Sequence, residues 1–142
     1  MKLENKPIFG GGGMNATLLW TNPNPNSSTG ATDIKFENLN DYDYLLVESK
    51  ESTSINNVYQ SLLPIAFERL TSSSNYYTAP ITSTYTGQTN WVVCGRKAGF
   101  RSDKKTLWFD VNNIIGLTSI SNDRNIPIKI FGIKGKINGI EK

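Results

Sequence analysis

Histidine is absent from this chain of 142 residues, and cysteine occurs only once. Because histidine is the side chain that most often moves protons at neutral pH, its absence excludes Ser-His-Asp and Cys-His catalytic arrangements. The single Cys94 excludes a disulfide within the chain, and the lack of histidine argues against a zinc site. Cys94 follows the apolar residues Trp91, Val92 and Val93, which favours a small core residue over a reactive thiol. The sequence therefore predicts a protein that is not an enzyme and that holds no metal or cofactor.

Long apolar runs are missing too, and residues 1–4 lack the basic and then apolar layout of a signal peptide. We therefore expect synthesis in the cytoplasm and no membrane insertion. The net charge is +3. Residues 1–50 carry four bases against six acids, and the remainder carries eleven bases against six acids. This weak asymmetry falls short of the dense basic stripe of a nucleic-acid binder, so nucleic acid is not expected as a partner.

What the sequence does contain is a series of short strand-like segments separated by turn residues. Four consecutive glycines, Gly10 to Gly13, disfavour regular structure because each loses much backbone entropy on ordering. We predict a flexible or partner-ordered lead over 1–15, a β domain over 16–137 and a tail over 138–142. The expected strands are 17–20, 33–37, 44–48, 65–70, 76–85 with a break at Pro80, 91–97, 104–111 and 126–133.

The segments 91–97 and 104–111 are expected to pair as a hairpin around residues 98–103. Many short strands without sustained helices favour an all-β, antiparallel β-sandwich or jelly-roll fold. One segment is ambiguous: the apolar residues of 54–63 fall at helical spacing, Ser54 can cap a helix and Pro64 can end it. A short helix or an irregular crossing is therefore an alternative there.

Three stretches of the predicted domain together resemble a known kind of module. Residues 19–25 read Leu-Trp-Thr-Asn-Pro-Asn-Pro, and 42–47 read Tyr-Asp-Tyr-Leu-Leu-Val. Residues 124–134 read Arg-Asn-Ile-Pro-Ile-Lys-Ile-Phe-Gly-Ile-Lys. Together they resemble the opening and closing strands of a β-rich module of minor structural, tail-fibre and head-fibre proteins of bacteriophages and prophages. The segment 50–90 matches no pattern of that module.

The resemblance implies a virion protein, made in the host cytoplasm and released by lysis. It further implies a host-attachment module that binds a surface glycan or protein, forms a homo-oligomer, most often a trimer, and joins other virion proteins through its N-terminal segment. The alternatives are a capsid decoration or head-fibre protein, a baseplate component, and a carbohydrate depolymerase. A depolymerase needs two carboxylates facing a cleft. Asp41 and Asp43 are a candidate pair, but they stand beside a turn, where Asp is common in any case.

Two groups of residues are candidates for ligand contact. Aromatic rings stack on the apolar faces of sugars while amides bond their hydroxyls, and one loop-flanked group supplies both: Tyr76, Tyr77, Tyr85, Asn90 and Trp91. Core packing of these aromatics is the alternative. A cationic group surrounds the expected hairpin loop: Arg96, Lys97, Arg101, Lys104 and Lys105. It would suit an anionic partner such as teichoic acid or an acidic neighbouring subunit. The alternative is a solvated hairpin whose charges only discourage edge-to-edge strand pairing.

Oxygen-rich loops leave calcium as a further alternative. One set is Asp41 and Asp43 with backbone carbonyls, and the other is Asp110, Asn112 and Asn113. Because Asp and Asn recur in ordinary turns, we expect turns at both places and no metal.

Overall fold

A computed structural model describes residues 15–69, 76–85, 92–115 and 119–135. Within these ranges the chain forms strands and two single-turn 3-10 helices, η1 (Leu39–Asp41) and η2 (Phe67–Arg69). The strands are β1 (Asn15–Thr21), β2 (Thr32–Lys35), β3 (Tyr44–Ser52), β4 (Val58–Pro64), β5 (Tyr76–Tyr77), β6 (Ile81–Tyr85), β7 (Val92–Arg96), β8 (Ala98–Phe100), β9 (Thr106–Phe109), β10 (Asn113–Ile115), β11 (Ser119–Ile120) and β12 (Arg124–Lys134). The all-β prediction is therefore confirmed.

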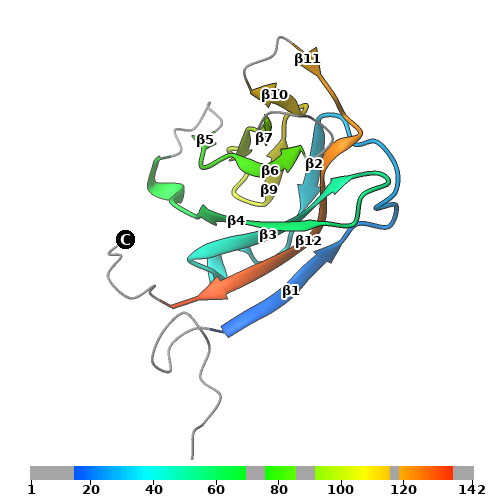
Figure 1. Ribbon diagram of the computed structural model, residues 1–142. Coiled ribbons are helices and arrows are strands. Elements are labelled where there is room, and N and C mark those ends of the chain that lie inside the picture. The colour runs from blue at the N-terminus through cyan, green and yellow to red at the C-terminus, as the bar shows by residue number, and fades with distance from the viewer. Residues whose placement is uncertain (1–14, 70–75, 86–91, 116–118, 136–142) are drawn as a thin grey trace, which may run out of the picture.

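The strands form three antiparallel sheets of four strands each. Sheet A has the order β1-β12-β3-β4, sheet B the order β2-β9-β8-β5, and sheet C the order β11-β10-β7-β6. In Figure 1, sheet A crosses the lower part of the molecule, and the strands of sheets B and C lie above it. This layered arrangement is the sandwich-like architecture expected from the sequence.

The main hydrophobic core lies between sheet A and the layer formed by sheet B and β6. Val47 of β3 and Ile130 of β12 pack there against Phe100 of β8 and Phe109 of β9, all of them fully buried. Alternation along each strand explains which side chains reach the core, because every second side chain points to the same face of the sheet. In β9, Leu107 and Phe109 therefore belong to the core, and Trp108 between them lies on the opposite face of sheet B.

The helical alternative over 54–63 is wrong. Residues 58–64 form β4, which pairs with β3 in a continuous antiparallel register from Lys50↔Val58 to Tyr44↔Pro64. The turn before β4 is held by buried Glu51, whose carboxylate accepts a hydrogen bond from the Asn57 side chain at 2.9 Å. Pairing with β3 satisfies the backbone groups of β4 that face β3 and buries Leu63, and this outweighs a helical spacing of apolar residues.

Two other strand predictions are corrected. The segment 65–70 contains the 3-10 turn η2 rather than a strand. The expected hairpin between 91–97 and 104–111 does not form either, because 98–100 are themselves strand β8, which pairs with β9 in sheet B. Strand β7 instead pairs with β6 and β10 in sheet C. The chain therefore crosses from one sheet to the next at Lys97.

The crossing coincides with a fully buried arginine at the end of β7. The Arg96 guanidinium donates to the carbonyl oxygens of Asn125 (2.8 Å), Asp110 (3.1 Å) and Arg124 (3.1 Å), and more weakly to those of Gly30 (3.3 Å) and Asn122 (3.5 Å). These oxygens belong to the loop before β2, the residue after β9 and the start of β12. Arg96 thereby ties together the segments that join the sheets.

The predicted segments at the two ends of the chain lie almost entirely outside the described residues. The lead over 1–15 with Gly10 to Gly13 and the tail over 138–142 lie outside the described residues, apart from Asn15, where β1 begins.

Candidate functional site

A row of paired residues crosses all four strands of sheet B, and its side chains lie on the outer face of the sheet. Asp33 of β2 pairs with Trp108 of β9, Trp108 pairs with Gly99 of β8, and Gly99 pairs with Tyr77 of β5. Paired residues of antiparallel strands project to the same face, so this row lies opposite the core. Gly99 leaves room for the indole, since a Cβ there would lie 2.8 Å from Trp108 Nε1 and 2.4 Å from the Tyr76 carbonyl oxygen.

Aromatic rings and cations stack on one another along this row. The edge of the Tyr77 ring meets Trp108 with centroids 4.9 Å apart and planes at 76°. The Arg101 guanidinium lies 5.1 Å from the Trp108 ring centroid, and the Lys97 ammonium lies 5.8 Å from the Tyr77 centroid. Both distances fall in the range of a cation–π contact. Tyr77 is 58% exposed and Trp108 only 7%, so Trp108 supports a surface that Tyr77, Lys97 and Arg101 present to solvent.

Arg101 also makes an ion pair that is easily exchanged. Its Nη2 lies 2.9 Å from Asp33 Oδ1, and the two side chains are 37% and 50% exposed. An ion pair this exposed contributes at most about 1 kcal/mol because water screens it. An incoming anion can therefore take the place of Asp33 at little cost.

Two open hollows flank the exposed Tyr77 ring. One, of about 490 Å³, is lined by residues of β2 and β9 and includes Arg101, Trp108 and Asp110. The other, of about 370 Å³, is lined by 77–80 together with Lys97 and Ala98. The face thus offers an aromatic ring, two cations and adjoining concave surface, which is the chemistry that binds an anionic ligand with apolar faces. We call Tyr77, Lys97, Arg101 and Trp108 the sheet B platform.

The structure brings together parts of the two groups that the sequence kept separate. Tyr77 came from the proposed sugar site, and Lys97 and Arg101 came from the cationic group. Tyr76 does not join them, because its ring stacks on core residue Phe100 at 6.2 Å on the other face of the sheet. Tyr85 lies in β6 of sheet C and its side chain is outside the described residues, as are Asn90 and Trp91.

The cationic group is corrected at one residue. Arg96 is fully buried and donates to backbone carbonyls, so it cannot meet a partner at the surface. Burial lowers its pKa to about 10. Lys104 and Lys105 are exposed in the turn between β8 and β9, and Lys104 has a positive φ of 58°. They are close to the platform in sequence, but the cations that lie over its rings are Lys97 and Arg101.

Sequence reasoning missed Trp108 and Asp33. The signal for Trp108 was present, because a large aromatic between two core positions of a short strand must lie on the outer face. The partner of Trp108 was not available from the sequence, since Asp33 is brought beside it by the pairing of β2 with β9.

Among the described residues, Cys94 is the candidate thiol nucleophile, and Asp110 with its neighbours is a candidate metal site. Burial raises the pKa of the Cys94 thiol, although bonds to Asn112 and Ser83 and the charge of Arg124 lower it in part. In the part of the chain that the structure describes, no three His, Cys, Asp or Glu side chains gather to hold a metal ion. Asp110, Asn112 and Asn113 do not form the expected turn: Asp110 Oδ1 accepts from Val111 N at 2.8 Å, Asn112 Nδ2 donates to Ser121 O at 3.0 Å, and Asn113 begins β10.

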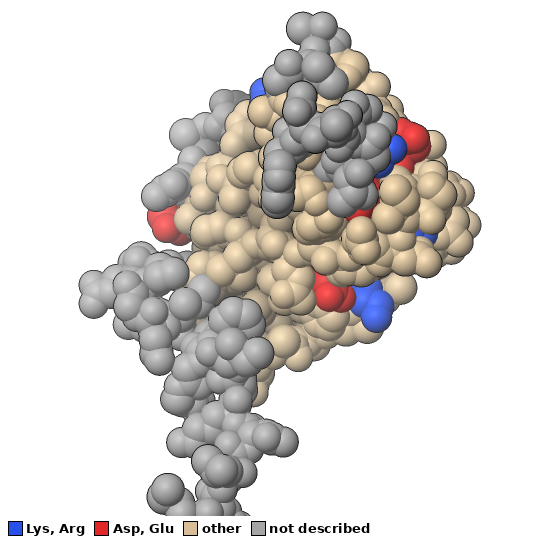
Figure 2. Space-filling model, viewed as in Figure 1, with Lys and Arg blue, Asp and Glu red and all other residues tan. Residues whose placement is uncertain are grey.

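On the face seen in Figure 2, the visible Lys and Arg side chains of the described residues lie apart and next to acids or uncharged surface. None of the helices within the described ranges is long and apolar enough to span a membrane.

Comparisons with protein-family models, with curated proteins and with solved structures found no match for this chain.

Proposed function

We propose that this protein is a structural module of a bacteriophage or prophage virion that attaches to the host surface through the sheet B platform. The observation that carries the proposal is the convergence of Tyr77, Lys97 and Arg101 on one exposed sheet face. The resemblance of residues 19–25, 42–47 and 124–134 to phage structural modules supplies the biological setting. The predicted lead over 1–15 would join the module to the rest of the particle.

The chemistry of the platform favours an anionic surface polymer. Lys97 and Arg101 supply two positive charges, and the Arg101 guanidinium can hold a phosphate or carboxylate through two parallel hydrogen bonds. Tyr77 supplies a ring face or edge for the carbon skeleton between the charged groups. A teichoic-acid chain, with repeating phosphates on a polyol, combines both features. The protein would bind this polymer without cleaving it.

A binding titration with poly(glycerol phosphate) tests the proposal. We expect Tyr77→Ala, and the double variant Lys97→Ala with Arg101→Ala, each to weaken binding by about tenfold or more. The matched control is Lys129→Ala with Lys134→Ala, which removes the same charge from exposed positions of β12 in sheet A. Equal weakening in the control would mean that only net charge matters, and it would overturn the assignment of the platform.

Two further measurements separate attachment from the alternatives. The folded protein should bind host cells and not cells that lack the anionic polymer. The polymer recovered after incubation should keep its length, and shortening would establish a depolymerase instead.

A second candidate function is structural, with other virion proteins or further copies of this chain as partners. It is favoured by an exposed aliphatic cluster on the outer face of sheet C: Val93 (36% exposed), Ile115 (59%) and Ile120 (62%). Exposed apolar clusters of this kind often mark protein contacts. Light scattering tests it: self-association through this cluster predicts a trimer for the wild type and a monomer for Ile115→Lys, whereas a monomeric wild type contradicts it.

A further inference from the structure

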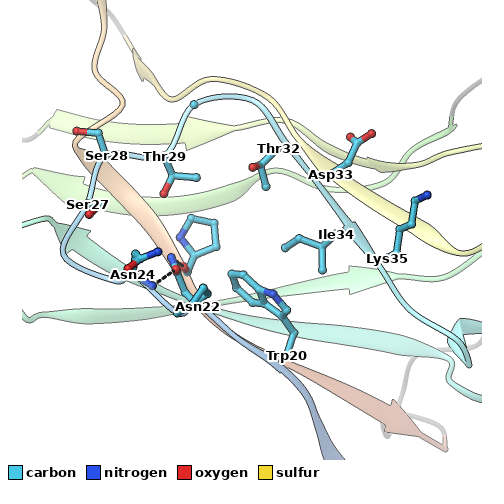
Figure 3. A pocket seen from close by; sticks show the side chains of 13 residues that line it. Trp20, Asn22, Asn24, Ser27, Ser28, Thr29, Thr32, Asp33, Ile34 and Lys35 are labelled. Carbon is cyan, nitrogen blue, oxygen red and sulfur yellow. Dashed lines mark hydrogen bonds between the residues drawn. The ribbon is translucent and has the colours of Figure 1, made fainter.

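A second pocket lies on the other side of β2 from the platform, between the end of β1 and β2. Its volume is about 580 Å³, and its wall includes the loop that joins these two strands. Figure 3 shows Trp20 pointing from β1 into this space, with Thr29, Thr32 and Ile34 pointing into it from the loop and from β2. The pocket and the hollow beside the platform share Thr32 and Asp33. We call this pocket the β1–β2 cleft.

The side chains facing the cleft are uncharged. Asp33 and Lys35 belong to the wall, but Figure 3 shows their side chains on the opposite side of β2. The remaining lining combines an indole, prolines, amides and hydroxyls, including those of Asn22, Thr29 and Thr32. An aromatic ring with a surrounding set of neutral hydroxyl and amide groups suits a ligand that has apolar faces and many hydroxyls of its own.

The backbone of β2 adds hydrogen-bonding groups. Strand β2 is at the edge of sheet B, where it pairs with β9. The Phe36 N–H donates to Lys105 O at 2.8 Å, so alternate residues before it, Ile34 and Thr32, also point their backbone groups toward β9. The N–H and C=O groups of Asp33 and Lys35 consequently point away from β9, toward the cleft.

The wall of the cleft is held in place before any ligand arrives. Asn22 N donates to Ile128 O at 2.8 Å, and Asn22 Nδ2 donates to Pro127 O at 2.9 Å. At the other end of the loop, Thr29 N donates to Asn122 O at 2.8 Å and Gly30 O accepts from Arg96. A wall fixed at both ends loses little conformational entropy on binding, which favours affinity.

We propose that the β1–β2 cleft is a binding site for one or two units of a neutral saccharide, with the sugar stacked on Trp20 and its hydroxyls bonded to Thr29, Thr32 and the edge of β2. A peptide strand added to β2 is the competing occupant. The loop from Asn22 to Ala31 favours the saccharide, because it joins β1 to β2 and closes the cleft at the Thr32 end, so an extended strand could not run through. The source of the sugar rests on the proposed attachment function: the saccharide would be a neutral part of the host surface.

Titration with free methyl glycosides of glucose, galactose and N-acetylglucosamine tests the site by NMR. We expect at least one of them to bind in the millimolar range and to shift the backbone amides of Gly30 and Thr32 and the indole N–H of Trp20. The indole signal is assigned with Trp20→Phe, which keeps a ring against the core. Replacing Thr29→Val and Thr32→Val together removes two hydroxyls at constant shape and should weaken binding about tenfold.

Control variants distinguish glycoside binding at the β1–β2 cleft from polymer binding at the sheet B platform. Thr82→Val makes the same chemical change at an exposed position of β6 and should leave glycoside binding within about twofold. Tyr77→Ala should weaken poly(glycerol phosphate) binding and leave glycoside binding unchanged. If poly(glycerol phosphate) binds while all three glycosides fail to shift the cleft amides, the cleft proposal falls and the platform stands. If acetyl-Thr-Val-Thr-Val-amide shifts these amides and the glycosides do not, the cleft is a peptide site and the proposal is overturned.

Discussion

Replacing Arg96 with methionine tests how the three sheets are held together. Methionine keeps the length of the apolar stem but removes the charge and all the donors. The carbonyl oxygens of Gly30, Asp110 and Asn125 then lose their guanidinium partner in the interior. We expect the free energy of unfolding to fall while the fold is retained.

The expected loss follows from opposing contributions. Three of the five hydrogen bonds are 3.1 Å or shorter, and a hydrogen bond to a charged group contributes about 1.5–3 kcal/mol. Against this stands the cost of burying the charge, which is also what lowers the pKa of Arg96 to about 10. Leaving a buried carbonyl oxygen without a donor costs about 1–3 kcal/mol, and Arg96→Met leaves several of them. We therefore expect a loss of about 3–4 kcal/mol for Arg96→Met and a smaller loss for Arg96→Lys, which keeps the charge.

Urea unfolding followed by tryptophan fluorescence measures the change, with the slope of the transition as a check that the unfolded state is unaltered. Arg101→Met is the matched control, because it deletes an exposed guanidinium whose ion pair contributes at most about 1 kcal/mol. A loss below about 1 kcal/mol for Arg96→Met, or equal losses in the two variants, would refute the claim that Arg96 joins the sheets.

Three other predictions concern the fold. Gly132→Ala should lose about 1–3 kcal/mol of stability in urea unfolding, because its Cβ would lie 2.6 Å from the Tyr42 ring; the double variant with Tyr42→Ala should recover part of the loss, and no recovery would contradict the clash. Burial raises the pKa of Asp103, but hydrogen bonds from the Thr106 hydroxyl and from two backbone N–H groups outweigh it, so its net pKa lies below 3.8. The contribution of the Asp103 carboxylate to stability is therefore full above pH 3.8 and is lost as the pH falls through the folded-state pKa. The free energy of unfolding, measured between pH 5 and pH 2 (about the range where Asp titrates), should fall less for Asp103→Asn than for the wild type. Equal falls in the two proteins would contradict this linkage. Cys94 is fully buried, so a thiol reagent should label it only at the rate of unfolding, and fast labelling of the native protein would contradict its place in the core.

The strand content was predictable because it depends on local patterns. Alternation placed β2, and short apolar runs between turn residues placed β3 and β9, within a few residues of their actual bounds. The segment 54–63 failed for a nonlocal reason. Its helical spacing is real, yet Leu63 is buried through pairing with β3, and no local pattern reports which strand lies alongside.

The candidate site was predictable only in parts. Tyr77, Lys97 and Arg101 were identified by residue type, but their meeting on one face depends on the pairing of β5 with β8. Arg96 was misplaced because it is charged and stands next to Lys97 beside the expected hairpin loop, whereas its surroundings are the carbonyls of segments distant in the chain. The β1–β2 cleft was missed because the Asn-Pro-Asn-Pro segment was interpreted only as a turn, and its second role as a pocket wall appears once β2 lies beside Trp20.

An NMR map of poly(glycerol phosphate) bound to the folded protein tests directly whether the sheet B platform binds the polymer. Binding there should shift backbone amides of β5, β8 and β9, around Tyr77, Arg101 and Trp108. Shifts confined to the outer face of sheet C around Ile115 and Ile120, or a polymer that binds without shifting any amide of sheet B, would contradict it.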